Sequence, residues 1–579
     1  MKQSYLIHTI ELLIIISYLN GYSQISFEER AGLLGIEASY GMGEFGGGVS
    51  FFDYNNDGWD DITISSEEGS PIIFYKNVNG SFIVDNIIIS DDNYETKQVQ
   101  WVDFDNDGDM DLFATCATSL NKLYKNDGNF NFTDITISSG LDDTATNSWG
   151  SSWGDYNNDG YLDVYVCFRD FGDTQPNALF KNNGDGTFTN VSIDVELNQI
   201  IDPTFCAAFF DYNNDGWQDI FVTNHRFSQS YLYKNNGNET FTDVSVSTGA
   251  NVITDGMSAT IGDYNNDGWF DVYITNLGNS VSNVNVLLQN NGDETFTDVS
   301  IATGTDFFSV GWGAVFLDAD NDTYVDLYVS GMLDGSTALP SAFYKNQGDN
   351  TFVIPSGIGF ENDTAQSFSN AIGDVDNDGF PEIFVINENS NNYLWKNTSQ
   401  NSNNWLKVDL EGVISNRDGI GCEIEVFANG KSQYRYTLNG EGYICQNSST
   451  EFFGIGSASS IDYVKVKWLS GVEDVLYDVE INKTIRIKEG ENVLSINEAT
   501  FDRFSVYPNP SKGIFNLELN YFDLEKTVSV FDIYGRLVKG ERALNNRISK
   551  IDLKEMSTGI YFFKVSSKKG VNIKKVILK

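Results

Sequence analysis

Histidine is nearly absent from this chain of 579 residues, which contains only His8 and His225. We expect His8 to be lost with an N-terminal signal, so the mature chain keeps one histidine. One histidine argues against zinc sites made of several histidines and against Ser-His-Asp hydrolysis. Carboxylate chemistry remains open, because aspartate and glutamate together number 82.

Basic residues are also scarce. Lysine and arginine number 36 against those 82 acidic residues, so the formal net charge is −46. Such a charge repels phosphate backbones and anionic lipids, and it therefore argues against nucleic acid or a lipid surface as the partner. If the carboxylates cluster, the same charge favours bound cations.

Long apolar runs are limited to the N-terminus. Lys2 precedes an apolar run from Leu6 to Leu19, and small residues follow at Gly21 and Ser23, a pattern typical of a secretory signal. The sequence predicts a signal peptide over residues 1–23 and no transmembrane segment after its removal. Glu11 is unusual inside such a run, so an uncleaved anchor is the alternative, although the run is shorter than the ~20 residues that span a membrane.

Cysteine is rare, with five residues and no CxxC spacing. Cys116, Cys167 and Cys206 lie in apolar, strand-like runs, where we expect small buried thiols. Cys422 and Cys445 lie in one later region and could form a disulfide, but sequence alone does not fix connectivity.

Proline is rare too, with 8 residues, whereas there are 53 glycines and 14% aromatic residues, a composition that predicts many short strands and tight turns. Acidic turns such as "DYNNDGWDD" recur at spacings of 50 to 56 residues and begin at Asp53, Asp103, Asp155, Asp211, Asp263, Asp318 and Asp374. A hairpin signature such as "LYKNNGNETFTDV" follows each turn by about twenty residues. Turns and hairpins together predict seven units.

Each unit reads as four short strands, the first of which is rich in small residues ("WGSSWGD", "CAAFFD"). Small residues suit a crowded position near an axis, and four-stranded sheets repeated around an axis form a β-propeller. The sequence therefore predicts an all-β chain with a seven-bladed propeller over residues 24–400. The seventh unit lacks a fourth strand, and we expect "ISFEERAGL", near the mature N-terminus, to complete that blade.

The acidic turns follow the pattern D-x-[DN]-x-D-G-x-x-[DE]. Positions 1, 3, 5 and 9 converge their side-chain oxygens and position 7 offers a carbonyl, a set of hard ligands that suits Ca²⁺. A metal-free turn rich in Asp and Asn is the alternative. The predicted ligands are Asp53, Asn55, Asp57, Trp59 and Asp61; Asp103, Asp105, Asp107, Asp109 and Asp111; Asp155, Asn157, Asp159, Tyr161 and Asp163; Asp211, Asn213, Asp215, Trp217 and Asp219; Asp263, Asn265, Asp267, Trp269 and Asp271; Asp318, Asp320, Asp322, Tyr324 and Asp326; and Asp374, Asp376, Asp378, Phe380 and Glu382.

Up to seven Ca²⁺ ions are therefore predicted. Two turns depart from the pattern, because Thr323 replaces the glycine of the sixth turn and Glu382 closes the seventh. A β-branched residue at a positive φ is strained, so we expect the sixth site to be the weakest.

The turns and hairpins, exemplified by "DYNNDGWQDIFVTN" and "YLYKNNGNETFTDV", resemble the FG-GAP/VCBS repeats of bacterial surface proteins over about residues 27–397. The resemblance implies calcium in the turns on one face of a propeller and ligands or partners on the opposite face. It adds no catalytic residues.

Two further resemblances follow along the chain. "RDGIGCEIEVFANGKSQYRYTLNGEGYICQ" and "IDYVKVKWLSGVEDVL" are similar to the ASPIC/UnbV domain of the cartilage acidic protein family, over residues 404–489. After a linker over residues 490–503, "FSVYPNPSKGIFNLEL" and "LKEMSTGIYFFKV" resemble a type A C-terminal sorting domain over residues 504–579. That domain implies a β-sandwich, a partnership with the type IX secretion machinery, and a secreted or outer-surface location.

These features favour a non-enzymatic, calcium-binding surface or secreted protein that binds a glycan or a protein ligand, for example in adhesion. A carbohydrate-active enzyme, such as a polysaccharide lyase acting at the same face, is the alternative, and a cell-surface scaffold is a third possibility. The candidate ligand face lies opposite the acidic turns and carries the cationic and aromatic residues Arg169, Phe171, His225, Arg226 and Phe227.

Overall fold

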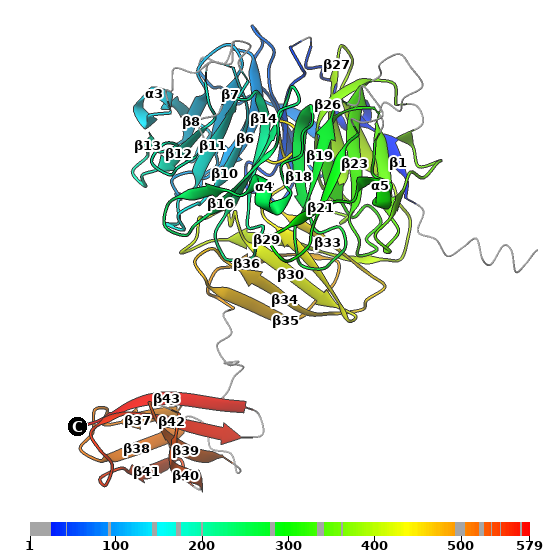
Figure 1. Cartoon of the computed structure of the whole chain (residues 1–579). Helices are drawn as coiled ribbons and strands as arrows, with labels where there is room; N and C mark the ends of the chain where they lie inside the picture. Colours follow the sequence, from blue (N-terminus) through cyan, green and yellow to red (C-terminus); the bar gives the residue numbers. More distant parts are fainter. Residues whose placement is uncertain are drawn as a thin grey trace, which may run out of the picture. The chain divides into compact units, whose positions relative to one another are not determined.

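The structure is a computed structural model that describes residues 25–41, 43–90, 94–141, 147–169, 175–197, 201–277, 284–307, 309–332, 341–360, 363–492, 504–519, 526–533, 535–544, 546–567 and 570–579. The predicted signal peptide lies outside these residues. The chain divides into two compact units, Met1–Asn492 and Val493–Lys579, and each is described by itself (Figure 1). Among the described residues, no helix is long and apolar enough to cross a membrane.

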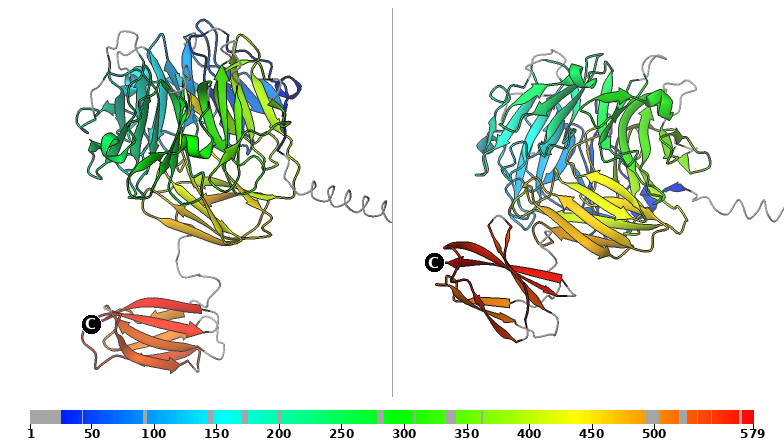
Figure 2. Two further views of the ribbon diagram at one scale, coloured as in Figure 1. Left: turned by 45° about the vertical axis from the view of Figure 1, so that its right-hand side comes forward. Right: turned by 60° about the horizontal axis from the view of Figure 1, so that its bottom comes forward.

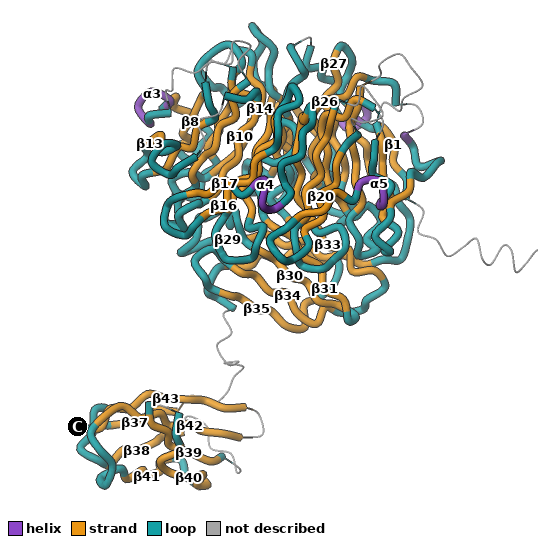
Figure 3. The backbone as a smooth tube through the Cα atoms, viewed as in Figure 1, coloured by secondary structure: helices purple, strands orange, loops and turns teal. Residues whose placement is uncertain are grey.

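The repeats, residues 25–400, are built from short antiparallel strands, shown as orange segments in Figure 3. The sheets have the orders β2-β3-β4-β5, β6-β7-β8-β9, β10-β11-β12-β13, β14-β15-β16-β17, β18-β19-β20-β21, β22-β23-β24-β25 and β26-β27-β28-β1. The first strands of these sheets are β2 (Val49–Phe52), β6 (Thr96–Val102), β10 (Ser148–Gly154), β14 (Thr204–Phe210), β18 (Gly256–Gly262), β22 (Val310–Leu317) and β26 (Gln366–Gly373).

The outer strands and four single-turn helices complete the repeats. They are β3 (Asp61–Ile64), β4 (Ile73–Asn77), β5 (Phe82–Asp85), β7 (Asp111–Cys116), β8 (Lys122–Asn126), β9 (Phe132–Asp134), β11 (Asp163–Phe168), β12 (Ala178–Asn182), β13 (Phe188–Asn190), β15 (Asp219–Asn224), β16 (Tyr231–Asn235), β17 (Phe241–Asp243), β19 (Asp271–Asn276), β20 (Val286–Asn290), β21 (Phe296–Asp298), β23 (Asp326–Met332), β24 (Ala342–Asn346), β25 (Phe352–Val353), β27 (Glu382–Glu388) and β28 (Tyr393–Asn397), with α2 (Ala31–Leu34), α3 (Thr136–Ser139), α4 (Ser245–Thr248) and α5 (Ser300–Thr303).

The first strands lie innermost and contact one another in succession, and β26 contacts β2. Small residues allow this approach. A Cβ added to Gly150 in β10 would lie 2.2 Å from the carbonyl oxygen of Phe205 in β14. The predicted four-strand units are thus present in an all-β, propeller-like arrangement.

The N-terminal strand β1 (Phe27–Glu29) closes the last sheet. It pairs antiparallel with β28, with Phe27 opposite Asn397 and Glu29 opposite Trp395. Phe27 is only 1% exposed. The predicted pairing of the N-terminal strand with the seventh unit is confirmed.

Residues 404–489, here called the capping segment, lie in the same compact unit as the repeats. The segment contains β29 (Asn404–Glu411), β30 (Glu423–Ala428), β31 (Lys431–Tyr436), β32 (Cys445–Gln446), β33 (Glu451–Gly456), β34 (Ile461–Lys467), β35 (Glu473–Val479) and β36 (Lys483–Lys488). Sheets β33-β29-β36 and β31-β30-β34-β35 enclose a core that includes Leu406, Val426 and Val464. The two sheets cover one end of the repeats (Figure 2).

Residues 438–449 of the capping segment, here called the plug loop, run inward between the first strands. Strand β32 pairs in parallel with β2, with Cys445 opposite Val49. Tyr443, which is fully buried, packs on Phe205 and Trp312 with ring centroids 5.6 and 5.1 Å away. All five cysteines are free and buried, so Cys422 and Cys445 do not form a disulfide.

The second unit contains two sheets, β37-β38-β41 and β40-β39-β42-β43. Phe515, Leu517 and Val530 are among the residues of their shared core. The strands are β37 (Phe504–Tyr507), β38 (Ile514–Leu519), β39 (Thr527–Asp532), β40 (Leu537–Ala543), β41 (Ile548–Asp552), β42 (Gly559–Ser567) and β43 (Gly570–Leu578).

Candidate metal-binding loops and ligand face

The acidic turns join the first and second strands of each sheet and are numbered loops 1 to 7 in chain order. Loop 4 shows their common geometry. The Asp211 carboxylate accepts hydrogen bonds from the backbone N–H groups of Asp215 (3.1 Å) and Gly216 (2.7 Å), and the Trp217 N–H donates to the Asp215 carboxylate (3.1 Å). The same three bonds occur in the other loops. The predicted ligand residues are therefore brought together loop by loop.

The carboxylate at position 9 begins the second strand and is fully buried in every loop. In loop 4, Asp219 accepts hydrogen bonds from the Asn235 N–H (2.7 Å) and the Tyr212 N–H (3.2 Å). The Asn235 side chain donates in turn to the Tyr156 carbonyl of loop 3 (2.7 Å). Equivalent bonds to the neighbouring loop start at Asn77, Asn182, Asn290, Asn346 and Asn397.

Three loops bring carboxylates close enough for one ion to bridge them. In the sets Asp103–Asp105–Asp111, Asp318–Asp320–Asp326 and Asp374–Asp376–Glu382, one oxygen of each residue lies within 4.8 Å of the others. In loop 2, Asp105 Oδ1 and Asp111 Oδ2 are buried and have no hydrogen-bond partner among the described residues. Orphaned acceptors inside a carboxylate cluster fit a bound cation, and all-oxygen ligands favour Ca²⁺.

Burial raises the pKa values of several loop carboxyl groups. Desolvation, together with nearby carboxylates, raises the pKa of Asp61 and of Asp111 to about 9, and that of Asp103 and of Asp318 to about 8. The carboxylates contribute because like charges disfavour ionisation. A divalent cation would remove both costs by stabilising the charged form.

Asparagines at position 4 connect the loops into a series. Each has a positive φ of 53 to 59°, which directs its side chain toward the next loop. Asn158 Nδ2 donates to the Gly216 carbonyl (3.1 Å), and Asn377 Nδ2 of loop 7 donates to the Gly58 carbonyl of loop 1 (2.9 Å). Equivalent bonds start at Asn106, Asn214, Asn266 and Asn321. The repeat pattern did not predict this role, although every turn has an Asn at position 4.

Loop 6 contains the strained residue that the sequence predicts. Thr323 has a φ of +92°, where the other loops have glycine. The seventh loop tolerates its longer side chain, since Glu382 is fully buried and accepts the Val375 N–H (2.7 Å).

Replacing Thr323 by glycine should therefore stabilise the protein. Relief of the left-handed strain should raise the free energy of unfolding by about 1 kcal/mol, measured by urea denaturation at fixed calcium. Gly216→Thr in loop 4 is the matched reverse change, since a Cβ there meets nothing within 4 Å, and it should destabilise by a similar amount. A Thr323→Gly protein less stable than the parent would contradict the strain argument.

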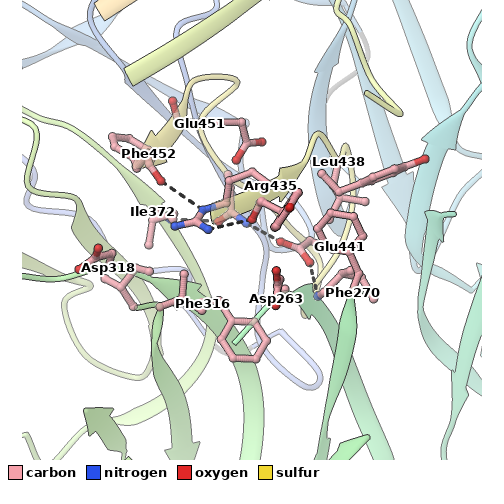
Figure 4. A pocket seen from close by; sticks show the side chains of 18 of the residues that line it. Asp263, Phe270, Phe316, Asp318, Ile372, Arg435, Leu438, Glu441, Glu451 and Phe452 are labelled. Atoms are coloured by element: carbon pink, nitrogen blue, oxygen red, sulfur yellow. Dashed lines mark hydrogen bonds between the residues drawn. The ribbon is translucent and has the colours of Figure 1, made fainter. Parts of the chain in front are cut away.

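The capping segment docks on the loops through charged groups. Lys407 Nζ lies 2.9 Å from the Asp374 carboxylate of loop 7, and Arg417 lies 3.6 Å from that of Asp103 in loop 2. A cavity of about 80 Å³ remains between the segment and loops 5 and 6 (Figure 4). Arg435 and Glu441 are among its lining residues.

The candidate ligand face lies around a buried group of aromatic residues, here called the inner aromatic cluster, which includes Trp149, Phe205, Trp312 and Tyr443 and against which Phe45 packs. The Arg169 guanidinium stacks on Phe45 (4.3 Å) and Phe205 (4.8 Å) and is 3% exposed. His225 packs edge-on against the same Phe205, and its Nδ1 lies 2.8 Å from Asp255 Oδ1.

Two residues of the predicted face are accessible. Arg226 is exposed and Phe227 is 52% exposed, and both have positive φ angles of 60 and 58°. Such conformations are costly for large residues and concentrate at functional sites. Phe171 lies outside the described residues.

Family models match along most of the chain. An FG-GAP-like repeat model matches residues 53–114, 103–166, 168–222 and 211–274. An ASPIC and UnbV model matches residues 412–494, and a secretion system C-terminal sorting domain model matches residues 505–579. The chain is an FG-GAP-repeat protein with an ASPIC/UnbV domain and a C-terminal sorting domain.

Relatives of this FG-GAP-repeat protein include cartilage acidic protein 1. The Xenopus tropicalis protein is 23% identical over 471 residues, covering 73% of this chain and 70% of the relative. The Mus musculus protein is 22% identical over 490 residues, covering 76% and 73%. Among solved structures, a Photorhabdus luminescens Tc holotoxin pore aligns with a TM-score of 0.27 and 10% identity, over 80% of this chain and 22% of that one.

Proposed function

We propose that this protein is a calcium-stabilised ligand-binding protein, exported by the type IX system to the cell surface or beyond it. The observation that carries the calcium assignment is the convergence of carboxylates in loops 2, 6 and 7, together with the two orphaned acceptors of loop 2. Ca²⁺ would be held by the side chains at positions 1, 3, 5 and 9 and the carbonyl at position 7 of each loop. It would neutralise the loops and fix their conformation.

We further propose that the repeats form a closed, seven-bladed propeller. Support comes from the contact of β26 with β2, from the pairing of β1 with β28, and from the bond between Asn377 and Gly58 that joins loop 7 to loop 1. Closure leaves no open sheet edge between the last and first units.

Export rests on the match to the sorting domain over residues 505–579. We propose that a signal peptide over residues 1–23 directs the chain across the inner membrane. The sorting domain would then engage the type IX machinery and be removed during release or attachment at the surface.

The ligand would bind at the face opposite the loops, because the capping segment covers part of the loop face. The exposed Arg226 and Phe227 offer a cation and an aromatic ring to a glycan or a protein ligand. Arg169 is buried and would hold the rings of Phe45 and Phe205 in place without contacting the ligand.

A polysaccharide lyase-like enzyme is the second candidate, and the His225–Asp255 pair favours it. Asp255 Oδ1 lies 2.8 Å from His225 Nδ1, although the pair lacks hydrogen-bond geometry, and a carboxylate beside an imidazole is one element of general-base catalysis. The leading proposal is binding without turnover, because His225 is only 9% exposed, whereas Arg226 and Phe227 are exposed.

The mature protein incubated with a panel of polysaccharides should show saturable binding and no time-dependent products. An Arg226→Ala/Phe227→Ala variant should bind at least about tenfold more weakly, measured by glycan array and calorimetry. Lys181→Met, on an outer strand, is the matched control. Accumulation of unsaturated or shortened sugars, abolished by His225→Gln, would instead establish the enzyme.

A further inference from the structure

Each hairpin places one residue of its third strand beside the acidic loop of its own unit. This residue is lysine in all units but the fifth, where it is Gln289. The lysines are Lys76, Lys125, Lys181, Lys234, Lys345 and Lys396. Although they share one position in the repeat, they have different partners.

In loop 6, the lysine ammonium lies within the carboxylate cluster. Lys345 Nζ lies 2.9 Å from Asp320 Oδ1, 2.9 Å from Asp322 Oδ2 and 3.1 Å from Asp326 Oδ1. Its side chain is 15% exposed. Because these carboxylates are the predicted metal ligands, the ammonium takes the place of a metal ion.

Loop 7 repeats the arrangement. Lys396 Nζ lies 2.8 Å from Asp376 Oδ1, 3.4 Å from Asp378 Oδ2 and 2.6 Å from Glu382 Oε1. Its side chain is 16% exposed. Nearby carboxylates hold the pKa of this lysine, like that of Lys345, above its usual value, against the opposing effect of burial.

Loop 2 has the same four carboxylates but a different lysine position. Lys125 is 40% exposed and pairs with Asp105 Oδ2 and, at 3.5 Å, with Asp107. Asp105 Oδ1 and Asp111 Oδ2 keep no hydrogen-bond partner among the described residues. The interior of loop 2 is therefore not neutralised by its lysine.

In loops 3 and 4 the lysine turns away from the cluster. Lys181 pairs with Glu239 of the next unit (3.4 Å), and Lys234 pairs with Glu294 of the next (3.3 Å). Lys234 comes no closer than 4.0 Å to Asp215 of its own loop. These loops carry Asn157 and Asn213 at position 3, and hence one carboxylate fewer.

We propose that Lys345 and Lys396 are built-in cations of loops 6 and 7, which calcium must displace in order to bind there. The inference rests on the proposed calcium function and divides the sites into two classes. In loops 1 and 2 the lysine is more exposed and contacts fewer carboxylates, since Lys76 pairs with Asp57 (3.0 Å) and Lys125 with Asp105 and Asp107. Loops 6 and 7, whose lysines each contact three carboxylates, therefore bind Ca²⁺ more weakly than loops 1 to 5. At low calcium the two lysines keep these loops neutralised and ordered.

The two classes of calcium site have a structural consequence, because loops 6 and 7 contact the capping segment. Lys407 contacts Asp374 of loop 7, and Asn403 Nδ2 donates to the Asp320 carbonyl of loop 6 (2.8 Å). A loop that stays ordered without metal holds the segment in place when the other loops lose calcium.

Calcium binding to the mature full chain, measured by equilibrium dialysis with ⁴⁵Ca²⁺, tests the inference. The parent should show five tighter and two weaker sites. In Lys345→Met/Lys396→Met, the two weaker sites should tighten about tenfold or more, because a competing charge within hydrogen-bond distance is removed. Lys181→Met/Lys234→Met is the matched control, because these lysines pair with a glutamate of the next unit, and it should leave the two classes unchanged.

The outcomes separate the two proposals. A parent that binds no calcium contradicts the proposed function and the inference together. A parent that binds calcium, with a double variant whose sites are unchanged or weaker, overturns the inference alone, since the lysines would then remain beside the metal. If the double variant does not fold, Lys345→Met alone should tighten one site, and failure to do so overturns the inference equally.

Discussion

Removing calcium from the mature protein should lower its melting temperature by more than about 10 °C. Each site held at a hundred times its Kd adds about 2.7 kcal/mol to the free energy of unfolding. Several loops act on one cooperative structure, because asparagines such as Asn158 and Asn377 form hydrogen bonds between neighbouring loops. Differential scanning calorimetry with excess calcium and with excess EGTA measures the shift.

Added Ca²⁺ should restore the original melting temperature, whereas Mg²⁺ at the same concentration should restore little of it. Mg²⁺ demands a tighter octahedral shell and dehydrates reluctantly. Identical melting curves with and without chelator would show that calcium does not stabilise the protein. The loops would then be metal-free turns held by their hydrogen bonds alone.

Deleting residues 26–32 should lower the free energy of unfolding by more than about 5 kcal/mol. Removing a buried phenylalanine such as Phe27 costs about 3–5 kcal/mol by itself, and Phe27 packs against Phe343 and Phe360 (5.6 and 5.0 Å). The deletion also leaves the edge of β28 without the partner that it has in β1. Urea denaturation, followed by tryptophan fluorescence, measures the loss.

Glu28→Ala is the control for this deletion, because the Glu28 side chain is 49% exposed and β1 keeps its backbone bonds. That variant should stay within about 0.5 kcal/mol of the parent. A deletion protein as stable as the parent would show that the last sheet does not need the N-terminal strand. The free energy of unfolding of Phe27→Ala should lie between those of the parent and of the deletion protein.

Much of the repeat architecture could be predicted from the sequence because its signals are periodic. The glycine at position 6 and the carboxylate at position 9 mark a strand, a tight turn and a second strand, and the structure places them so. The repeat pattern also predicted β1, since "ISFEERAGL" matches the fourth strand that the last unit lacks. The strain at Thr323 followed from one departure in a repeated pattern.

What could not be predicted depends on contacts between distant segments. The plug loop has no counterpart in the repeats, so no period pointed to Tyr443 at the inner aromatic cluster. The burial of Arg169 was hidden for a similar reason, because its stacking partner Phe45 comes from another unit. Lys181 and Lys234 pair with glutamates one unit away, a contact that the repeat pattern does not reveal.

The plug loop also has a kinetic consequence. Ser50 Oγ and Gln446 Oε1 are 2.7 Å apart, although 396 positions separate these residues, and Ser26 and Ser399 are joined across 373 positions. Folding rates fall as contacting residues lie farther apart along the chain. The innermost contacts therefore form only after residues beyond 440 have been synthesised.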